Sequence, residues 1–148
     1  MKGGAMLSEN LINYLRDNGW WFEEVSIPYK EALESIGLSA DSQIGFFYLH
    51  AEDGPHFISQ KGMIYQLCWF VLNTDYGLAA ESLRKSLCLP PNLIPLDSFE
   101  GEGGFFYNKE SGQVFELSIG ASLSDFLDGK PTKKWRDFNS FIEDFFDI

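Results

Sequence analysis

The pattern that most limits the fold lies in the last third of the chain. Two short segments rich in strand-forming residues, 105–107 (FFY) and 114–117 (VFEL), flank the loop Asn-Lys-Glu-Ser-Gly at 108–112. Strand-forming residues on both sides of a short loop that contains glycine indicate a β-hairpin. A further short strand at 93–96 precedes the glycine-rich turn at 100–104. We therefore expect a mostly antiparallel β-sheet in this region.

Helices are predicted before and after the sheet in the sequence. Apolar residues recur at helical spacing after Ser8, and Pro28 stands where the first turn of a second helix accepts a proline. A third helix is expected from Thr74 or Asp75 to about Leu87. The final helix carries an aromatic stripe formed by Trp135, Phe138, Phe141, Ile142 and Phe145. This order of elements predicts the α+β class, with a mostly antiparallel sheet flanked by N-terminal and C-terminal helices.

Three segments are less clear. Residues 39–50 combine a helix-capping Ser39 with a run of strand-forming residues, so both assignments stay open. The apolar run 64–72 fits a central strand or a buried helix, and its aromatic and β-branched residues favour the strand. Residues 125–131 are expected to form an irregular connection.

The length of 148 residues fits one globular domain, which we expect to span residues 6–148 after a disordered lead at 1–5. Cys68 and Cys88 show neither metal-ligand nor disulfide spacing, and Cys68 lies in an apolar run, as expected of a buried thiol. The N-terminus lacks the apolar stretch of a signal peptide, and no run is long enough to span a membrane. We therefore expect a cytoplasmic protein.

The formal net charge of −11 limits the choice of partner. Phosphate binding depends on clustered Lys and Arg, so nucleic acid is disfavoured as a direct ligand, and an anionic membrane is disfavoured for the same reason. An acidic surface instead favours a basic partner, because opposite charges speed and orient the encounter. Acidity alone is also compatible with simple solubility.

No motif predicts catalysis or a cofactor. The glycine-rich turn at 100–104 lacks the Lys-Ser/Thr of a phosphate loop, and no nucleophile elbow or zinc-protease motif is present. The densest polar cluster is His50, Glu52, Asp53 and His56, which surrounds an Asp-Gly-Pro turn signal. We interpret it as a surface turn, and a small metal-dependent hydrolase using His50, Asp53 and His56 stays as an alternative.

The chain resembles the SUKH superfamily, which includes fungal regulators of cell-wall glucan synthesis and many bacterial toxin-immunity proteins. The resemblance rests on Ile94-Pro95-Leu96, on Gly103-Gly104-Phe105, on the hairpin return at Gly112, Val114 and Phe115, and on Ser140 to Phe145 in the last helix. Residues 27–49 are also similar to the family's helix, break and second helix. The resemblance implies that residues 39–49 are helical.

The resemblance also implies a binding module without catalytic chemistry. It indicates an immunity protein that neutralises a partner toxin, often a nuclease and therefore basic where it holds phosphate. A regulatory scaffold of the fungal type is the alternative. The candidate contacts are acidic residues for steering and an aromatic anchor, namely Asp97, Glu100 and Glu102 on the loop at the sheet end, with Trp20, Glu23 and Glu24 near the amino end. For the pair Trp20 and Trp21, packing of both against the protein is the favoured interpretation.

Overall fold

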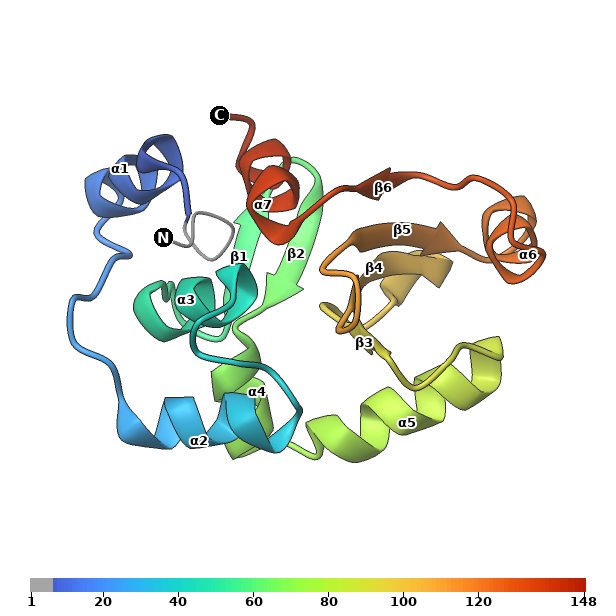
Figure 1. Ribbon diagram of the computed structural model, residues 1–148, viewed down its shortest axis with the longest axis horizontal. Coiled ribbons are helices and arrows are strands. Elements are labelled where there is room, and N and C mark those ends of the chain that lie inside the picture. Colours follow the sequence, from blue (N-terminus) through green and yellow to red (C-terminus); the bar gives the residue numbers. More distant parts are fainter. Residues whose placement is uncertain (1–6) are drawn as a thin grey trace.

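A four-stranded antiparallel sheet forms one part of the computed structural model, which describes residues 7–148 (Figure 1). Its strands are β3 (Leu93–Pro95), β4 (Gly103–Asn108), β5 (Val114–Ser118) and β6 (Lys134–Trp135), in the order β3-β4-β5-β6. The predicted hairpin is confirmed as β4 and β5. The expected disordered lead at residues 1–5 lies outside the described residues.

Alternation along the strands gives the sheet two apolar faces. Phe106 pairs with Phe115 and belongs to a buried cluster with the end of α5 (Tyr76–Leu87) and with α6 (Ala121–Leu127). Tyr107 pairs with Val114, and both belong to the larger cluster on the opposite face. There the ring centroids of Phe105 and Phe141 lie 5.0 Å apart, which places α7 (Phe138–Phe146) against the sheet. Both faces are therefore covered by helices.

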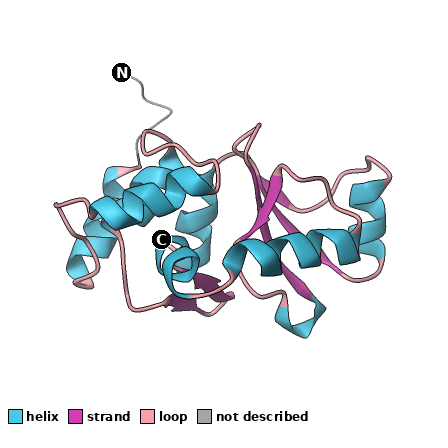
Figure 2. Cartoon of the chain, turned by 90° about the horizontal axis from the view of Figure 1, so that it is seen from below, coloured by secondary structure: helices cyan, strands magenta, loops and turns pink. Residues whose placement is uncertain are grey.

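The larger cluster continues into a mainly helical region. It contains α1 (Glu9–Asp17), α2 (Ile27–Ser35), α3 (Gln43–His50), α4 (Leu67–Asn73) and a small hairpin of β1 (His56–Ser59) and β2 (Gly62–Tyr65). Figure 2 shows most of the helices gathered at one end of the molecule and the larger sheet at the other. Helices beside a separate antiparallel sheet confirm the α+β class predicted from the sequence.

The segment 39–50, which the sequence left open, is helical in the part that forms α3. Ser42 caps it, because its hydroxyl accepts a hydrogen bond from the Gly45 N–H at 3.0 Å. Ile44, Phe47 and Tyr48 are fully buried in the core. Burial of one helical face thus outweighs the strand propensity of the aromatic run.

The interpretation of residues 64–72 as a central strand is wrong. β2 ends at Tyr65, and α4 begins at Leu67. Gln66 separates the two elements because its side-chain oxygen accepts hydrogen bonds from the N–H groups of Cys68 and Trp69. Cys68 is buried, as predicted, and burial raises the pKa of its thiol to about 12.

Two boundaries near the carboxyl end also differ from expectation. Residues 121–127 form the helix α6, so the connection expected at 125–131 begins later. Trp135 belongs to β6, where it pairs with Val114, and α7 begins only at Phe138. Asp137 caps α7 by accepting a hydrogen bond from the Ser140 N–H at 2.8 Å. The aromatic stripe therefore continues from a strand into a helix.

Candidate functional site

A cleft opens between the β1–β2 hairpin and the larger sheet. It consists of two adjoining cavities of about 190 Å³ each, which share the lining residues Lys61, Phe105 and Glu116. The first cavity also contacts Asp97 and Glu100, two of the residues predicted from the sequence. The hairpin and the sheet are tied together at its inner end, because the Tyr65 N–H donates to the Leu96 carbonyl at 2.8 Å. This cleft is the candidate site.

Asp97 is held at the sheet side of the cleft, just after β3. Its carboxylate accepts a hydrogen bond from the Phe99 N–H at 3.2 Å. A Cβ atom on Gly104 would lie only 2.2 Å from the Asp97 Oδ1 atom, so the carboxylate occupies space that a side chain on β4 would fill. Burial raises the pKa of Asp97 to about 7, although backbone hydrogen bonds partly oppose the shift. Within residues 7–148, no ion pair joins this carboxylate to a cation.

The two other predicted acids follow in a short 3₁₀ turn, η2 (Glu100–Glu102). Glu100 lines the cleft, whereas Glu102 is exposed and is not part of the lining. The turn is tight because two of its residues, Gly101 and Glu102, and the preceding Phe99 adopt positive φ angles between 60° and 70°. The structure therefore brings Asp97 and Glu100 together and leaves Glu102 outside.

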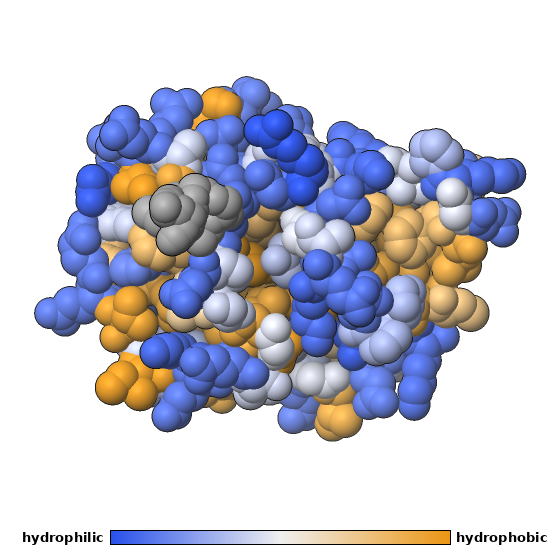
Figure 3. Space-filling view, viewed as in Figure 1, coloured by the Kyte–Doolittle hydropathy of each residue, from blue (hydrophilic) through white to orange (hydrophobic). Residues whose placement is uncertain are grey.

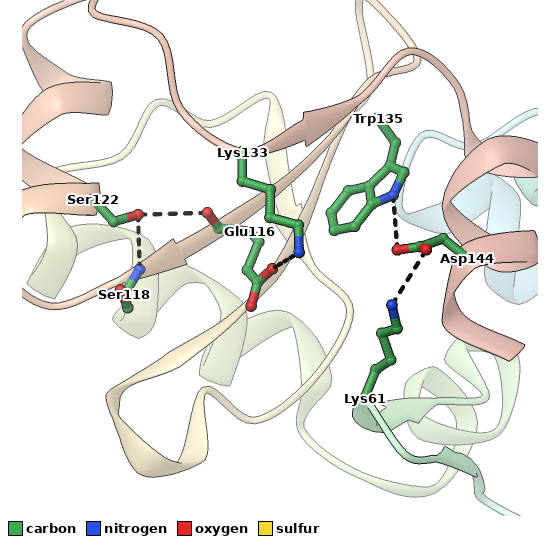
Figure 4. Close-up of polar contacts among 7 residues, drawn as sticks. All are labelled: Lys61, Glu116, Ser118, Ser122, Lys133, Trp135 and Asp144. Atoms are coloured by element: carbon green, nitrogen blue, oxygen red, sulfur yellow. Dashed lines mark hydrogen bonds and ion pairs between the residues drawn. The ribbon is translucent and has the colours of Figure 1, made fainter. Parts of the chain in front are cut away.

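Two ion pairs border the second cavity (Figure 4). Lys61 Nζ lies 3.2 Å from Asp144 Oδ1, and Trp135 donates its indole N–H to the same carboxylate at 3.2 Å. Lys133 Nζ lies 3.2 Å from Glu116 Oε1. Both lysines that line the cleft thus already have carboxylate partners. The carboxyl groups at the cleft that form no ion pair within residues 7–148 are those of Asp97 and Glu100.

The candidate residues near the amino end lie on the connection between α1 and α2, and none of them lines the cleft. Trp20 is half-buried, with its ring 6.2 Å from Phe57 and 5.8 Å from Phe146. Trp21 is also half-buried and stacks on His50 at 5.0 Å. Both tryptophans thus pack against the protein, which is the interpretation that the sequence favoured for this pair. The more exposed aromatic residue is Phe22, at 49%.

Glu23 and Glu24 have different surroundings. Glu23 accepts hydrogen bonds from Arg16 at 2.9 Å and from the Trp21 indole at 3.0 Å, and these contacts lower its pKa. Glu24 is exposed and lines a hollow beside the connection.

His50, Asp53 and His56 are not arranged as a metal site. His50 donates through Nδ1 to the Phe22 carbonyl at 2.7 Å. His56 lies at the cleft, and its ring is 5.1 Å from that of Phe70. Among residues 7–148, no three His, Cys, Asp or Glu side chains are grouped so that they could hold a metal ion. The geometry therefore does not provide the ligand set that the hydrolase alternative requires.

Reasoning from the sequence did not assign five further cleft residues to a functional site. Lys61 and Tyr65 come from the hairpin, and Glu116 comes from β5. Trp135 belongs to β6, and Lys133 directly precedes this strand. No local motif links these positions, because their proximity depends on how the hairpin docks beside the sheet.

Comparisons of the chain with protein-family models, with curated proteins and with solved structures return no match. No helix in the described part of the chain combines the length and the apolar character needed to cross a bilayer.

Proposed function

We propose that this protein is a non-catalytic binding module of the SUKH type that acts as an immunity protein, neutralising a basic toxin domain by direct contact. The observation that carries the proposal is the Asp97 carboxylate, which lies at an open cleft and forms no ion pair with a cation among residues 7–148. The two lysines at the same cleft already have carboxylate partners. A Lys or Arg side chain of a partner would supply the missing positive charge.

The cleft has room for a side chain of a partner. Each of its two adjoining cavities measures about 190 Å³, which suits one long side chain inserted from a protein surface. The aromatic residues Tyr65, Phe105 and Trp135 line the same space and could contact the apolar stem of that side chain.

Charge also supports a basic partner. A toxin domain that binds nucleic acid is positive where it holds phosphate, and a molecule with a net charge of −11 attracts such a surface over a long range. The buried carboxylate would then strengthen the final contact, because charge pairs away from water are weakly screened.

A capture experiment tests this proposal. The tagged protein is incubated with lysate of its native cells at 50 mM and 500 mM salt, and bound proteins are identified by mass spectrometry. We expect a stoichiometric basic partner of toxin type that is lost at high salt and is weakened by Asp97→Asn and Glu100→Lys. Glu110→Lys, on the exposed loop between β4 and β5, is the matched control and should retain binding.

Two outcomes would contradict the proposal. Capture of a cell-wall or signalling protein in place of a toxin would favour the regulatory-scaffold alternative. Equal binding by the wild type and both cleft variants would remove the cleft from the interaction.

A further inference from the structure

The connection between α1 and α2, together with the first residue of α2, exposes apolar side chains. Phe22 is 49% exposed, Val25 40% and Ile27 70%. Figure 3 shows hydrophobic surface at the lower left of the molecule, over the segment that leads into α2. We call residues 20–27 the apolar loop. Three exposed apolar residues within six positions are unusual for a surface that contacts only water.

The apolar loop is held firmly by the carboxyl end of α3. The Phe22 N–H donates to the His50 carbonyl at 2.7 Å, and His50 Nδ1 returns a hydrogen bond to the Phe22 carbonyl at 2.7 Å. The Glu52 N–H donates to the Trp20 carbonyl at 3.0 Å. Trp21 stacks on His50, with the Arg16 guanidinium 5.8 Å from its ring. Residues 20–22 of the apolar loop, fixed in this way, lose little conformational entropy when a partner binds.

A hollow of about 360 Å³ lies beside the apolar loop and carries negative charge. Glu24 and Glu52 line it together with Phe22, Tyr29 and His50, and no Lys or Arg is among its lining residues. The Tyr29 hydroxyl donates to Glu52 at 2.8 Å, which fixes this carboxylate at the wall. The surface thus combines an exposed aromatic ring with acidic groups that form no ion pair with a Lys or Arg of residues 7–148.

We propose that the apolar loop and this hollow form a docking surface for a basic polypeptide segment, which places an apolar side chain against Phe22 and a Lys or Arg side chain in the hollow. A second copy of this chain does not fit, because each copy carries a net charge of −11 and the surface itself is acidic. The inference does not rest on the cleft, since no residue of the apolar loop lines it.

Peptide selection tests the docking surface without a known partner. A phage-displayed library of random 12-residue peptides is selected on the immobilised full chain, and enriched peptides are synthesised for affinity measurement. We expect them to place Lys or Arg next to an aromatic or aliphatic residue. Phe22→Ser and Glu24→Lys should each weaken their binding about tenfold, as expected at the centre of a contact.

Controls separate this surface from the rest of the molecule. Leu78→Ser removes a side chain on α5 that is 69% exposed, and it should leave affinity unchanged. Asp97→Asn should also leave the affinity for the selected peptides unchanged. Failure of the cleft proposal can therefore be told apart from failure of the docking-surface proposal. If Phe22→Ser lowers the melting temperature, Ile27→Ser replaces it, because Ile27 is 70% exposed.

Three results would overturn the inference. The first is a library that yields no peptide whose binding depends on Phe22 or Ile27. The second is selection of peptides without cationic residues. The third is sedimentation showing that the wild type self-associates and that Phe22→Ser abolishes the association.

Discussion

Asp97 illustrates how a single side chain depends on its surroundings. In the sequence it is one of 22 acidic residues and has no distinguishing neighbour. In the fold it lies against Gly104, accepts a backbone hydrogen bond, and has a pKa of about 7 because burial disfavours its charged form. Such a carboxylate makes the fold less stable when it is ionised.

This residue predicts a specific pH dependence. Between pH 4 and 7 the folded state binds more protons at Asp97 than the unfolded state does, so its contribution to the free energy of unfolding falls as pH rises. The contribution is fully present below pH 4 and is lost above pH 7. Asp97→Asn should therefore match the wild type near pH 4 and exceed its stability by about 4 kcal/mol at pH 8, because a pKa raised from 3.8 to about 7 is worth about 1.4 kcal/mol per unit.

Urea unfolding of both proteins at pH 4.5, 6, 7 and 8 measures this difference. Asp53→Asn, at an exposed turn, provides the control for removal of a carboxylate. A difference between wild type and Asp97→Asn that does not change with pH would show that Asp97 is not buried as described.

Two helical glycines should respond to alanine in opposite ways. A Cβ atom on Gly45 would lie 1.9 Å from the Ser39 carbonyl oxygen, which is part of the backbone and cannot swing aside. Gly45→Ala should therefore destabilise the fold by about 3 kcal/mol. Gly77 has no atom within 4 Å of the same position, so Gly77→Ala should stabilise α5 by about 0.5–1 kcal/mol. Thermal unfolding of both variants tests the pair, and a shift of the same sign in both would contradict the prediction.

At the scale of elements, Gln66 connects three parts of the chain. It is completely buried, and its amide group donates to the carbonyls of Tyr48 and Ala51 at the end of α3, at 2.9 and 2.8 Å. Its oxygen caps the start of α4. One side chain thus ends α3, begins α4 and fixes the point where β2 stops.

Replacement of Gln66 should be costly in proportion to the hydrogen bonds it breaks. Gln66→Leu leaves buried carbonyl and N–H groups without this partner and should lower the free energy of unfolding by about 3 kcal/mol. Gln66→Glu should cost at least as much at neutral pH, because a carboxylate cannot donate to the two carbonyls. Urea unfolding measures both, and Gln60→Glu in the exposed hairpin turn should change stability by less than about 0.5 kcal/mol. A small effect of Gln66→Leu would mean that other groups cap α4.

At the scale of the whole molecule, the larger sheet joins two apolar clusters. Phe105 and Tyr107 face one cluster, and Phe106 between them faces the other. Three of the four tryptophans, Trp20, Trp21 and Trp135, pack against the first cluster, and Trp69 contacts Phe70 beside it, whereas the second cluster contains no tryptophan. Because the two clusters share the same strands, neither can lose its packing without disturbing the other.

We therefore expect one cooperative unfolding transition. Leu117 is fully buried in the cluster without tryptophan, and Leu117→Ala should lower stability by about 3 kcal/mol. The midpoint should shift equally when unfolding is followed by tryptophan fluorescence and by far-ultraviolet circular dichroism. Separate midpoints for the two signals would show that the clusters unfold independently.

The sequence alone determined much of this molecule. The β4–β5 hairpin, the capped α1 and the buried Cys68 follow from local turns, spacing and apolar runs, because neighbouring residues alone produce these features. The net charge follows from composition, and the expectation of a basic partner rests on it. Two members of the cleft, Asp97 and Glu100, were also named from the sequence.

Only the tertiary structure decided the rest. Residues 43–50 and 67–73 became helices against their strand propensity, because burial and the hydrogen bonds of Gln66 outweigh local preference. The cleft draws residues from the hairpin, β4, β5 and α7, which meet only after folding. Likewise, Trp20 and Phe22 are both aromatic in sequence, but packing against Phe57 and Phe146 covers Trp20 and leaves Phe22 exposed. Desolvation and exposure are properties of the assembled surface, so no local pattern encodes them.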